Sequence, residues 1–444
     1  MKSTPHHVQV PDTPAARAAM VVLKRLTGAG YEAVLVGGCV RDLYLDQHPK
    51  DYDVATAATP PQVTELFDRV VDVGVSFGVL RILIAEANGP EEVEVATFRQ
   101  DGPYQDGRHP TTVDFTNLVE DVKRRDFSLN GLAMRPTAKG GAVIDHVGGL
   151  KDLADKVLRA IGDPMERFEE DALRLLRGVR FAARFGLQIE PATSAAMRAC
   201  RDKLVAVSFE RVQSELLSML RGPDGHRAAL LMAEHGLHAP IWPELEGADP
   251  ALVRTSERIR LLREQLAERP AQLGDYAVCE ELEPALATAA FFAATRGEDG
   301  RLPVVIRETL RLSNVQLRGL TEIYSVRDQI LALATAAPSL APVAPEVIRC
   351  LRSEQGDAGL CLAMCDATEP QRTWLRRARQ ERARASAARW APTKWVTGAR
   401  LREMGYAPGP SFRAALWAAE AKQLSGGDEA TCLQEAVSVL GRVD

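Results

Sequence analysis

The sequence predicts an α+β protein, in which an N-terminal head with a mixed, mostly antiparallel five-stranded sheet is followed by an all-α neck, body and tail. Two observations support this prediction. Short apolar runs bounded by Gly, Pro and polar clusters fill the first 140 residues, as expected for strands and short helices. From about residue 150 the apolar residues recur at helical spacing, and no stretch has the pattern of a strand.

The elements of the head are expected in a definite order. A proline in the first turn opens a helix over 14–27, a short helix follows Gly38, and a capped helix covers 59–67. Residues 1–12 are expected to form a frayed tail, and 99–112 a polar loop. The expected strands are 31–36, 51–55, 70–75, 78–85 and 91–98.

The rest of the chain is divided by breaks rich in Gly and Pro, and 444 residues are too many for one hydrophobic core. The Pro/Ala-rich stretch 336–345 is the best linker candidate. The expected domains are a catalytic head at 1–140, a helical neck at 141–225, a helical body at 226–335 and a helical tail at 346–444.

The composition excludes several classes of protein. The net charge of −5 does not indicate a nucleic-acid binder, so any such surface must be local. The seven cysteines are scattered and odd in number, which argues against a disulfide framework, and Cys361 and Cys365 lie in an apolar helical setting typical of a core. No apolar leader and no run of about 18 apolar residues is present. We therefore expect a cytoplasmic protein with reduced thiols and no membrane contact.

The segment 35–56, LVGGCVRDLYLDQHPKDYDVAT, carries the first functional pattern. Asp51 and Asp53 lie two apart on an expected strand, so their side chains point the same way. Two adjacent carboxylates repel each other unless a divalent cation lies between them, and hard cations such as Mg²⁺ prefer oxygen ligands. The Gly37–Gly38 turn into a helix start offers backbone N–H groups to an anion. Metal-binding carboxylates beside a phosphate site predict nucleotidyl transfer, in which Mg²⁺ activates a ribose 3′-hydroxyl and holds a triphosphate.

A third carboxylate is expected from the last strand of the head. Glu94 is the preferred candidate and Glu92 the alternative, because an adjacent strand of the sheet can bring either within reach of the metal. An Asp-x-Asp pair alone is weak evidence for a metal site, since such a pair often lies exposed on the surface. The Gly-Gly-x-x-Arg-Asp sequence upstream is what favours function.

The next pattern is KRRDFSLN at 123–130. Three consecutive cations often form only a solvated face, but here they run directly into the apolar Phe127 and Leu129. Arg125 is therefore expected to pair with phosphate oxygens, and Asp126 and Asn130 to hydrogen-bond a ribose hydroxyl.

The third pattern, EEDALRLLRGVR at 169–180, is expected to place Asp171, Arg174, Arg177 and Arg180 on one helix face. An ordinary salt-bridge stripe is the alternative. A carboxylate beside a guanidinium presents an acceptor next to donors, which matches the edges of cytosine and adenine and not those of uracil and guanine. Arg177 and Arg180 would lie further along, towards the triphosphate.

Taken together, these motifs resemble the class II tRNA nucleotidyltransferase and bacterial poly(A) polymerase family. GGCVRD with DYDVAT is similar to its catalytic motif, RRDFSLNGLAM to its ribose motif, and EEDALRLLRGVRFAARFGLQIEPAT to its nucleotide-template motif. Residues 208–211 with Glu215 are similar to the helix-supporting motif that follows, and 396–416 to the tail element that contacts the tRNA elbow. The resemblance is dense over 31–221 and thin beyond.

The resemblance implies template-independent addition of CCA to the 3′ end of tRNA from CTP and ATP. It implies Mg²⁺ at Asp51 and Asp53, with Glu94 as the third carboxylate. The implied nucleotide contacts are Gly38, Arg41, Arg125, Asp126, Asp171, Arg174, Arg177 and Arg180.

Two departures from the family patterns distinguish subtypes. Poly(A) polymerases carry a Gly-basic-basic-Phe signature, whereas this chain has GVSF at 74–77, which argues against poly(A) synthesis. The loop between Glu94 and Arg124 keeps its full length, including Arg99, Tyr104 and Arg108, so addition of A is expected as well as of C. An enzyme that adds only CC or only A, acting with a partner enzyme, stays open.

A basic segment fits an RNA substrate. Residues 372–402 contain ten basic side chains and one acid, Glu381, with Trp374, Trp390 and Trp395 between them. A solvated face is the alternative, but the excess of cations favours contact with phosphates. The competing class of function, an RNA-binding protein with an inactive head, is disfavoured by the intact carboxylates. The sequence sets no expectation for the oligomeric state.

Overall fold

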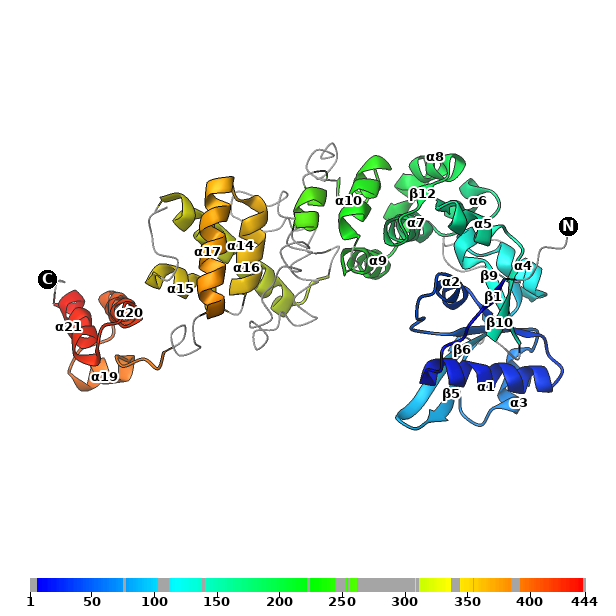
Figure 1. Ribbon diagram of the computed structural model, residues 1–444, viewed down its shortest axis with the longest axis horizontal. Helices are drawn as coiled ribbons and strands as arrows, with labels where there is room; N and C mark the ends of the chain where they lie inside the picture. Colours follow the sequence, from blue (N-terminus) through cyan, green and yellow to red (C-terminus); the bar gives the residue numbers. More distant parts are fainter. Residues whose placement is uncertain are drawn as a thin grey trace. The chain divides into compact units, whose positions relative to one another are not determined.

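The computed structural model (Figure 1) describes most of the chain. The described residues are 6–74, 77–102, 112–137, 140–221, 224–243, 253, 255–261, 308, 311–336, 344–353, 355–384 and 392–441. The chain forms two compact units, Met1–Met219 with Leu231–Gly247 and Leu220–Leu230 with Ala248–Asp444. Within the described ranges, no helix has both the length and the apolar character needed to cross a bilayer.

The first unit is built on one eight-stranded sheet. Its strands, in spatial order, are β1 (His7–Val8), β10 (Gly140–Asp145), β9 (Leu132–Thr137), β2 (Ala33–Val36), β3 (Asp53–Thr56), β6 (Gly89–Thr97), β5 (Val79–Glu86) and β4 (Val70–Gly74). Every neighbouring pair is antiparallel except β3 and β6, which are parallel. The mixed, mostly antiparallel sheet is confirmed, but the expected five strands are corrected to eight.

The three additional strands explain this correction. β1 lies in the expected frayed tail and pairs with β10, while β9 contains Pro136 and β10 begins with two glycines. Such short strands show little alternation, and long-range pairing rather than local propensity forms them. The sheet ends at Asp145, five residues beyond the expected head boundary at 140. Part of the expected polar loop is also paired, since β7 (Arg99–Asp101) and β8 (Val113–Phe115) form a small antiparallel sheet.

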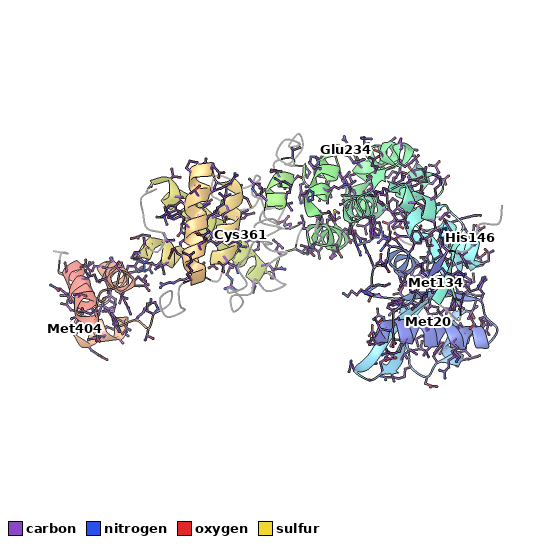
Figure 2. All side chains as sticks on the ribbon, in the orientation of Figure 1. Met20, Met134, His146, Glu234, Cys361 and Met404 are labelled. Atoms are coloured by element: carbon purple, nitrogen blue, oxygen red, sulfur yellow. The ribbon has the colours of Figure 1, made fainter. Side chains whose placement is uncertain are left out.

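Helices of the head follow the expected capping signals. α1 (Pro14–Gly28) starts at Thr13, whose hydroxyl accepts a hydrogen bond from Ala16 N–H, and it buries an apolar face against the sheet (Figure 1). α3 (Pro60–Leu66) begins with a capping box. α2 (Gly38–Tyr44) follows β2 directly. α4 (Leu118–Lys123) closes one edge of the core through Leu118 and Val122, and Met134 of β9 is fully buried in the head (Figure 2).

The neck is helical with one exception. Its helices are α5 (Gly149–Ala154), α6 (Pro164–Glu170), α7 (Leu173–Arg184), α8 (Pro191–Cys200) and α9 (Phe209–Arg221), and α10 (Gly225–Glu234) begins at its expected end. β11 (Val157–Leu158) and β12 (Gln188–Ile189) form a two-residue parallel pair, so the expectation of an all-α neck is corrected. A pair this short carries no periodicity that a sequence could display. The domain boundaries stay predictions.

The second unit is helical throughout its described residues. α14 (Asn314–Ala336), α15 (Pro345–Leu351), α16 (Gly356–Asp366) and α17 (Glu369–Arg384) share one hydrophobic cluster. α19 (Gly398–Glu403), α20 (Pro410–Leu424) and α21 (Glu429–Leu440) share another. Cys361 (labelled in Figure 2) and Cys365 are buried in α16 as expected. Trp374 of α17 is a core residue and is only 5% exposed. The linker candidate lies mostly outside the described residues, and so does Trp390.

Candidate active site

A polar cavity of about 680 Å³ lies in the first unit, where β2 and β3 meet α2 and α7. All the predicted site residues except Glu94 line this cavity, although in the sequence they extend from Gly38 to Arg180. Eight arginines and four aspartates face it. The surplus of cations fits a polyanionic ligand such as a nucleoside triphosphate.

The two aspartates of the catalytic motif meet in the cavity without sharing a strand. β3 begins at Asp53, and Asp51 lies in the irregular segment before it, so the expected strand 51–55 is corrected. Asp53 pairs in parallel register with Glu94 of β6. Glu92 lies two residues before Glu94 in β6, and its carboxylate forms an ion pair with Arg81 at 3.1 Å. This register places Glu94 nearer to Asp53 than Glu92.

The electrostatic surroundings of Asp53 are unfavourable for its charge. Burial raises the pKa of its carboxyl to about 6, the carboxylates of Glu94 and Asp51 act in the same direction, and Arg125 opposes them. Such a carboxylate gains most from a nearby cation. Within the described ranges, no group of three His, Cys, Asp or Glu side chains is gathered closely enough to hold a metal ion. Two carboxylates that share a divalent cation with substrate phosphates suit this donor set, since Mg²⁺ is usually bound in that way.

The glycine turn brings the backbone close to these groups. Gly37 has φ 76° and ψ −133°, and its N–H donates to Leu132 O at 2.9 Å. A Cβ at this position would lie 3.1 Å from Nη1 of Arg125. Glycine is required here because φ is positive and because the guanidinium of Arg125 fills the space. The turn directs the start of α2, at Gly38, into the cavity.

Asp126 is the centre of a buried hydrogen-bond network. Its Oδ2 accepts from Arg177 Nε and Nη2 at 2.8 and 2.6 Å, and its Oδ1 accepts from Asn130 Nδ2 at 3.0 Å and Phe127 N–H at 2.8 Å. Burial alone would raise the pKa of this carboxyl, but the charge of Arg177 and these hydrogen bonds hold it at about 2. Asn130 in turn accepts from Arg41 Nη1 at 2.5 Å. The three protein partners of Asp126 fix it as an anion, and its contact with a ribose hydroxyl stays a prediction.

Asp171 does not lie on the expected helix face. α6 ends at Glu170, Asp171 is extended with φ −151° and ψ 101°, and α7 begins at Leu173. Its Oδ1 accepts a hydrogen bond from Leu173 N–H at 3.1 Å. This correction has a simple cause, because an aspartate that binds the free N–H groups of a helix start favours a break there. Asp in front of the apolar run ALRLL was a signal for such a start.

Arg211 of α9 completes the surroundings of Asp171. Its Nη1 and Nη2 donate to the two carboxylate oxygens of Asp171 at 3.2 and 2.8 Å. A bidentate guanidinium fixes both the plane and the charge of a carboxylate. Arg211 belongs to the segment that resembles the helix-supporting motif, but no local pattern in the sequence indicates its partner.

Arg174 is held beside Asp171 by three acceptors. Its Nη1 donates to Glu170 Oε2 at 2.7 Å and to Arg167 O at 3.1 Å, and its Nη2 donates to Arg124 O at 3.3 Å. Arg174 is only 9% exposed although it lines the cavity. The sequence analysis did not single out Glu170, although Glu and Arg four residues apart are a common helical pair.

Arg177 and Arg180 follow one turn apart on α7, as expected. Glu215 of α9 accepts from Arg180 Nε at 2.6 Å and lies 3.9 Å from Arg177 Nη1. α9 therefore supports Asp171 through Arg211 and α7 through Glu215. Four residues that bear on the choice of subtype, Val75, Ser76, Tyr104 and Arg108, lie outside the described residues.

Comparisons with known proteins agree with this geometry. The profile of the family described as "Poly A polymerase head domain" matches residues 33–159. Residues 33–159 are thus similar to the head domain of this polymerase family. A second profile, described as "Probable RNA and SrmB-binding site of polymerase A", matches 186–248. The resemblance to the class II tRNA nucleotidyltransferase and bacterial poly(A) polymerase family is therefore confirmed.

Individual proteins that are similar to this chain bear a more specific name. A CCA-adding enzyme of Lactobacillus helveticus is 41% identical over 230 residues, which are 52% of this chain and 56% of that protein. A CCA-adding enzyme of Lacticaseibacillus paracasei is 42% identical over 245 residues, which are 55% and 60% of the two chains. The matched region thus spans less than two thirds of each relative's length.

Solved structures extend the likeness over nearly the whole fold. The CCA-adding enzyme of Bacillus stearothermophilus in complex with CTP aligns with a TM-score of 0.69 and 26% identity, over 97% of this chain and all of that one. A Thermotoga maritima CCA-adding enzyme complexed with tRNA aligns with a TM-score of 0.70 and 17% identity, over 98% and 99% of the chains. These alignments confirm the α+β fold class, with a sheet-containing head followed by helices.

Proposed function

We propose that this protein is a CCA tRNA nucleotidyltransferase, which adds CCA to the 3′ end of tRNA from CTP and ATP without a nucleic-acid template. The observation that carries this proposal is the meeting of two kinds of residue in one cavity. Asp51 and Asp53 supply the carboxylates of a nucleotidyl transfer site, and the Asp171–Arg174 pair supplies an edge that can recognise a base. The names of the relatives and solved structures support the same activity.

The reaction is an attack of the RNA 3′-hydroxyl oxygen on the α-phosphorus of a nucleoside triphosphate, with loss of the hydroxyl proton and release of pyrophosphate. We assign Asp51 and Asp53 to hold Mg²⁺, with Glu94 beside them. Bound Mg²⁺ would lower the pKa of the attacking hydroxyl and offset the charge that develops on the phosphate oxygens. Arg41, Arg125, Arg177 and Arg180 are proposed to bind the triphosphate.

Base selection follows from the fixed order of acceptor and donors. Asp171 offers a carboxylate oxygen to the exocyclic amino group of cytosine or adenine, and Arg174 offers N–H donors to the adjacent ring nitrogen. Arg211 binds Asp171 and Glu170 binds Arg174, and these contacts fix that order. Uracil and guanine present the reverse order and would leave buried polar groups unpaired, which is costly.

Features of the second unit support RNA as the partner. Three cations share one buried carboxylate, that of Glu420: Arg352 Nη1 lies at 2.8 Å, Lys394 Nζ at 3.2 Å and Arg349 Nε at 3.8 Å. The positive charge of this group is therefore larger than the negative charge of the carboxylate that binds it. Beside them Trp417 of α20 is 55% exposed. Cations around an exposed aromatic ring suit phosphates and stacked bases. We propose that this surface and residues 396–416 contact tRNA away from its 3′ end, at the elbow.

The alternatives belong to the same chemistry. A poly(A) polymerase would share the head, but the absence of a basic pair at 75–76 disfavours it. An enzyme limited to CC or to A would use the same carboxylates and differ in the loop that holds Tyr104 and Arg108. Addition of CCA to tRNA would place this protein in the cytoplasm.

The experiment that tests the proposal uses full-length protein, Mg²⁺, a tRNA transcript lacking CCA, and labelled CTP or ATP. Two C and one A followed by a stop would support it, with Asp53→Asn as the inactive control. Long A tracts would indicate the poly(A) polymerase, and CC or A alone would indicate a partial activity. No incorporation by the wild type would overturn the proposal in favour of an RNA-binding protein.

A further inference from the structure

Two phenylalanines of α7, Phe181 and Phe185, lie next to the cavity but have no role in the chemistry described so far. Their rings stack with centroids 6.5 Å apart and an interplanar angle of 23°. Phe181 lines the cavity and is anchored in the core by an edge-to-face contact with Phe127, with centroids 6.1 Å apart. Phe185 is half-buried at the end of α7. The two residues, here called the aromatic pair, present fixed ring faces.

Four cavity-lining arginines surround the aromatic pair. Arg41 Cζ lies 4.4 Å from the ring centroid of Phe185 and 5.6 Å from that of Phe181. The remaining guanidinium carbons lie at 4.3 Å for Arg180 and 5.3 Å for Arg177 from Phe181, and at 4.8 Å for Arg184 from Phe185. All fall within the ~6 Å range of a cation–π interaction. We call these four residues the arginine cluster.

The arginine cluster is not neutralised by the carboxylates in contact with it. Asp42 binds Arg41 at 2.7 Å and Arg184 at 3.7 Å, Asp126 binds Arg177, and Glu215 binds Arg180. Four cations therefore share three carboxylates. Burial lowers the pKa of Arg41, and the nearby charge of Arg184 acts in the same direction. The cluster must be held together against this repulsion before any ligand binds.

Aromatic ring faces can hold mutually repelling arginines together in a different way from carboxylates. The negative face of a ring attracts a guanidinium but does not cancel its charge, and it leaves the N–H groups at the edge of the guanidinium plane available. A fourth carboxylate in the same place would bind the cluster more firmly and would also repel phosphates. The rings thus stabilise the cluster and preserve its attraction for an anion.

We propose that Phe181 and Phe185 are positioning residues for triphosphate binding, because their stacked faces hold the arginine cluster in place and leave its positive charge to the phosphates of the incoming nucleotide. This inference rests on the proposed function, since it takes the ligand to be a nucleoside triphosphate. Phe185 is the better residue to test, because it is half-buried and lies outside the core contact with Phe127.

The test reduces the negative electrostatic potential on the ring face of Phe185 and keeps the shape of the side chain. Phe185 is replaced by phenylalanines with one, two and three ring fluorines, and by Phe185→Tyr and Phe185→Leu. Calorimetry then measures binding of CTP with Mg²⁺ to the full-length protein. The Kd is expected to rise stepwise with fluorination, to about tenfold for Phe185→Leu, which lies between the effects of an exposed and a desolvated cation–π contact. Phe185→Tyr should stay near the wild type, and kcat at saturating CTP should change little.

Phe67→Leu is the matched control. The ring of Phe67 lies 5.3 Å from Arg25 Cζ in the same unit, and neither residue lines the cavity. Its CTP affinity should equal that of the wild type. A flat response to fluorination, or an equal loss in Phe67→Leu, would overturn the proposal. Because calorimetry needs no RNA, a wild type that binds CTP but adds nothing to tRNA would refute only the proposed activity. Absence of CTP binding by the wild type would refute both.

Discussion

Asp126→Asn is the substitution whose effect the structure defines best. It keeps the shape of the side chain and removes the charge that faces Arg177 at 2.6 Å. The carboxyl of Asp126 has a pKa of about 2, against an ordinary value of 3.8. Since its side chain is only 7% exposed, the difference corresponds to about 2 kcal/mol of local stability at neutral pH. Asparagine can still accept from Phe127 N–H, but its amide nitrogen cannot accept from Arg177, so the substitution removes the ion pair together with its hydrogen bonds.

The sign of the pH dependence follows from the direction of the pKa. A carboxyl whose pKa is lower in the folded protein stabilises the fold above about pH 4, and the contribution is lost as the pH falls from about 4 to about 2. The wild type should therefore exceed Asp126→Asn in stability at pH 7. The two proteins should converge near pH 2, where Asp126 itself becomes neutral.

Hydrogen exchange of residues 127–131 in the full-length chain measures this effect locally, which matters because a protein of several domains does not unfold in one step. Protection of these amides should fall about 30-fold in Asp126→Asn at pH 7, the equivalent of about 2 kcal/mol. Glu32→Gln is the control, since Glu32 and Arg135 form an exposed ion pair that contributes little. Equal protection in wild type and Asp126→Asn, or a difference that persists unchanged to pH 2, would refute the reasoning.

Three further predictions concern the metal, the base and the RNA. Since burial and neighbouring carboxylates raise the pKa of Asp53 to about 6, Mg²⁺ affinity measured by calorimetry should fall with pH below 6, and a flat profile between pH 5 and 7.5 would contradict this. Arg211→Ala releases both oxygens of Asp171, so discrimination of CTP against UTP in single-nucleotide incorporation should drop about tenfold or more; unchanged selectivity would remove Arg211 from base recognition. Trp417→Ala should raise the KM for tRNA about tenfold and leave the KM for CTP unchanged, and a change in both would indicate a structural effect instead.

The sequence predicted those parts of the fold that local pattern controls. Alternation and turn residues located β2, β5 and β6, and capping signals located α1 and α3. β1, β9 and β10 were missed or only partly seen because two or six residues with glycine and proline have no clear period, and their stability comes from partners elsewhere in the chain. Long-range pairing is a property of the folded sheet and not of any short window.

The candidate site shows the same division. Residue type and spacing identified the groups that face the cavity, since nucleotidyl transfer demands carboxylates, arginines and a glycine turn. They did not identify Glu170, Arg211 or the aromatic pair, which contact the predicted cavity residues and hold them in place. The helical period of 3.6 residues also misplaced Asp171, because it was continued across the start of α7. Asp171 precedes that helix and accepts a hydrogen bond from the N–H of its first residue, Leu173.

The pairing of β3 with β6 explains why the third carboxylate was ambiguous in the sequence. Glu92 and Glu94 lie on the same face of one strand, so alternation alone cannot separate them. The register can, because Asp53 pairs with Glu94 and because Arg81 binds the carboxylate of Glu92. The parallel pair β3–β6 is the one exception in an otherwise antiparallel order, and it aligns the two carboxylates side by side. Burial is the main cause of the raised pKa of Asp53, and the repulsion by Glu94 that adds to it thus arises from the topology of the sheet. Both effects favour a divalent cation at this position.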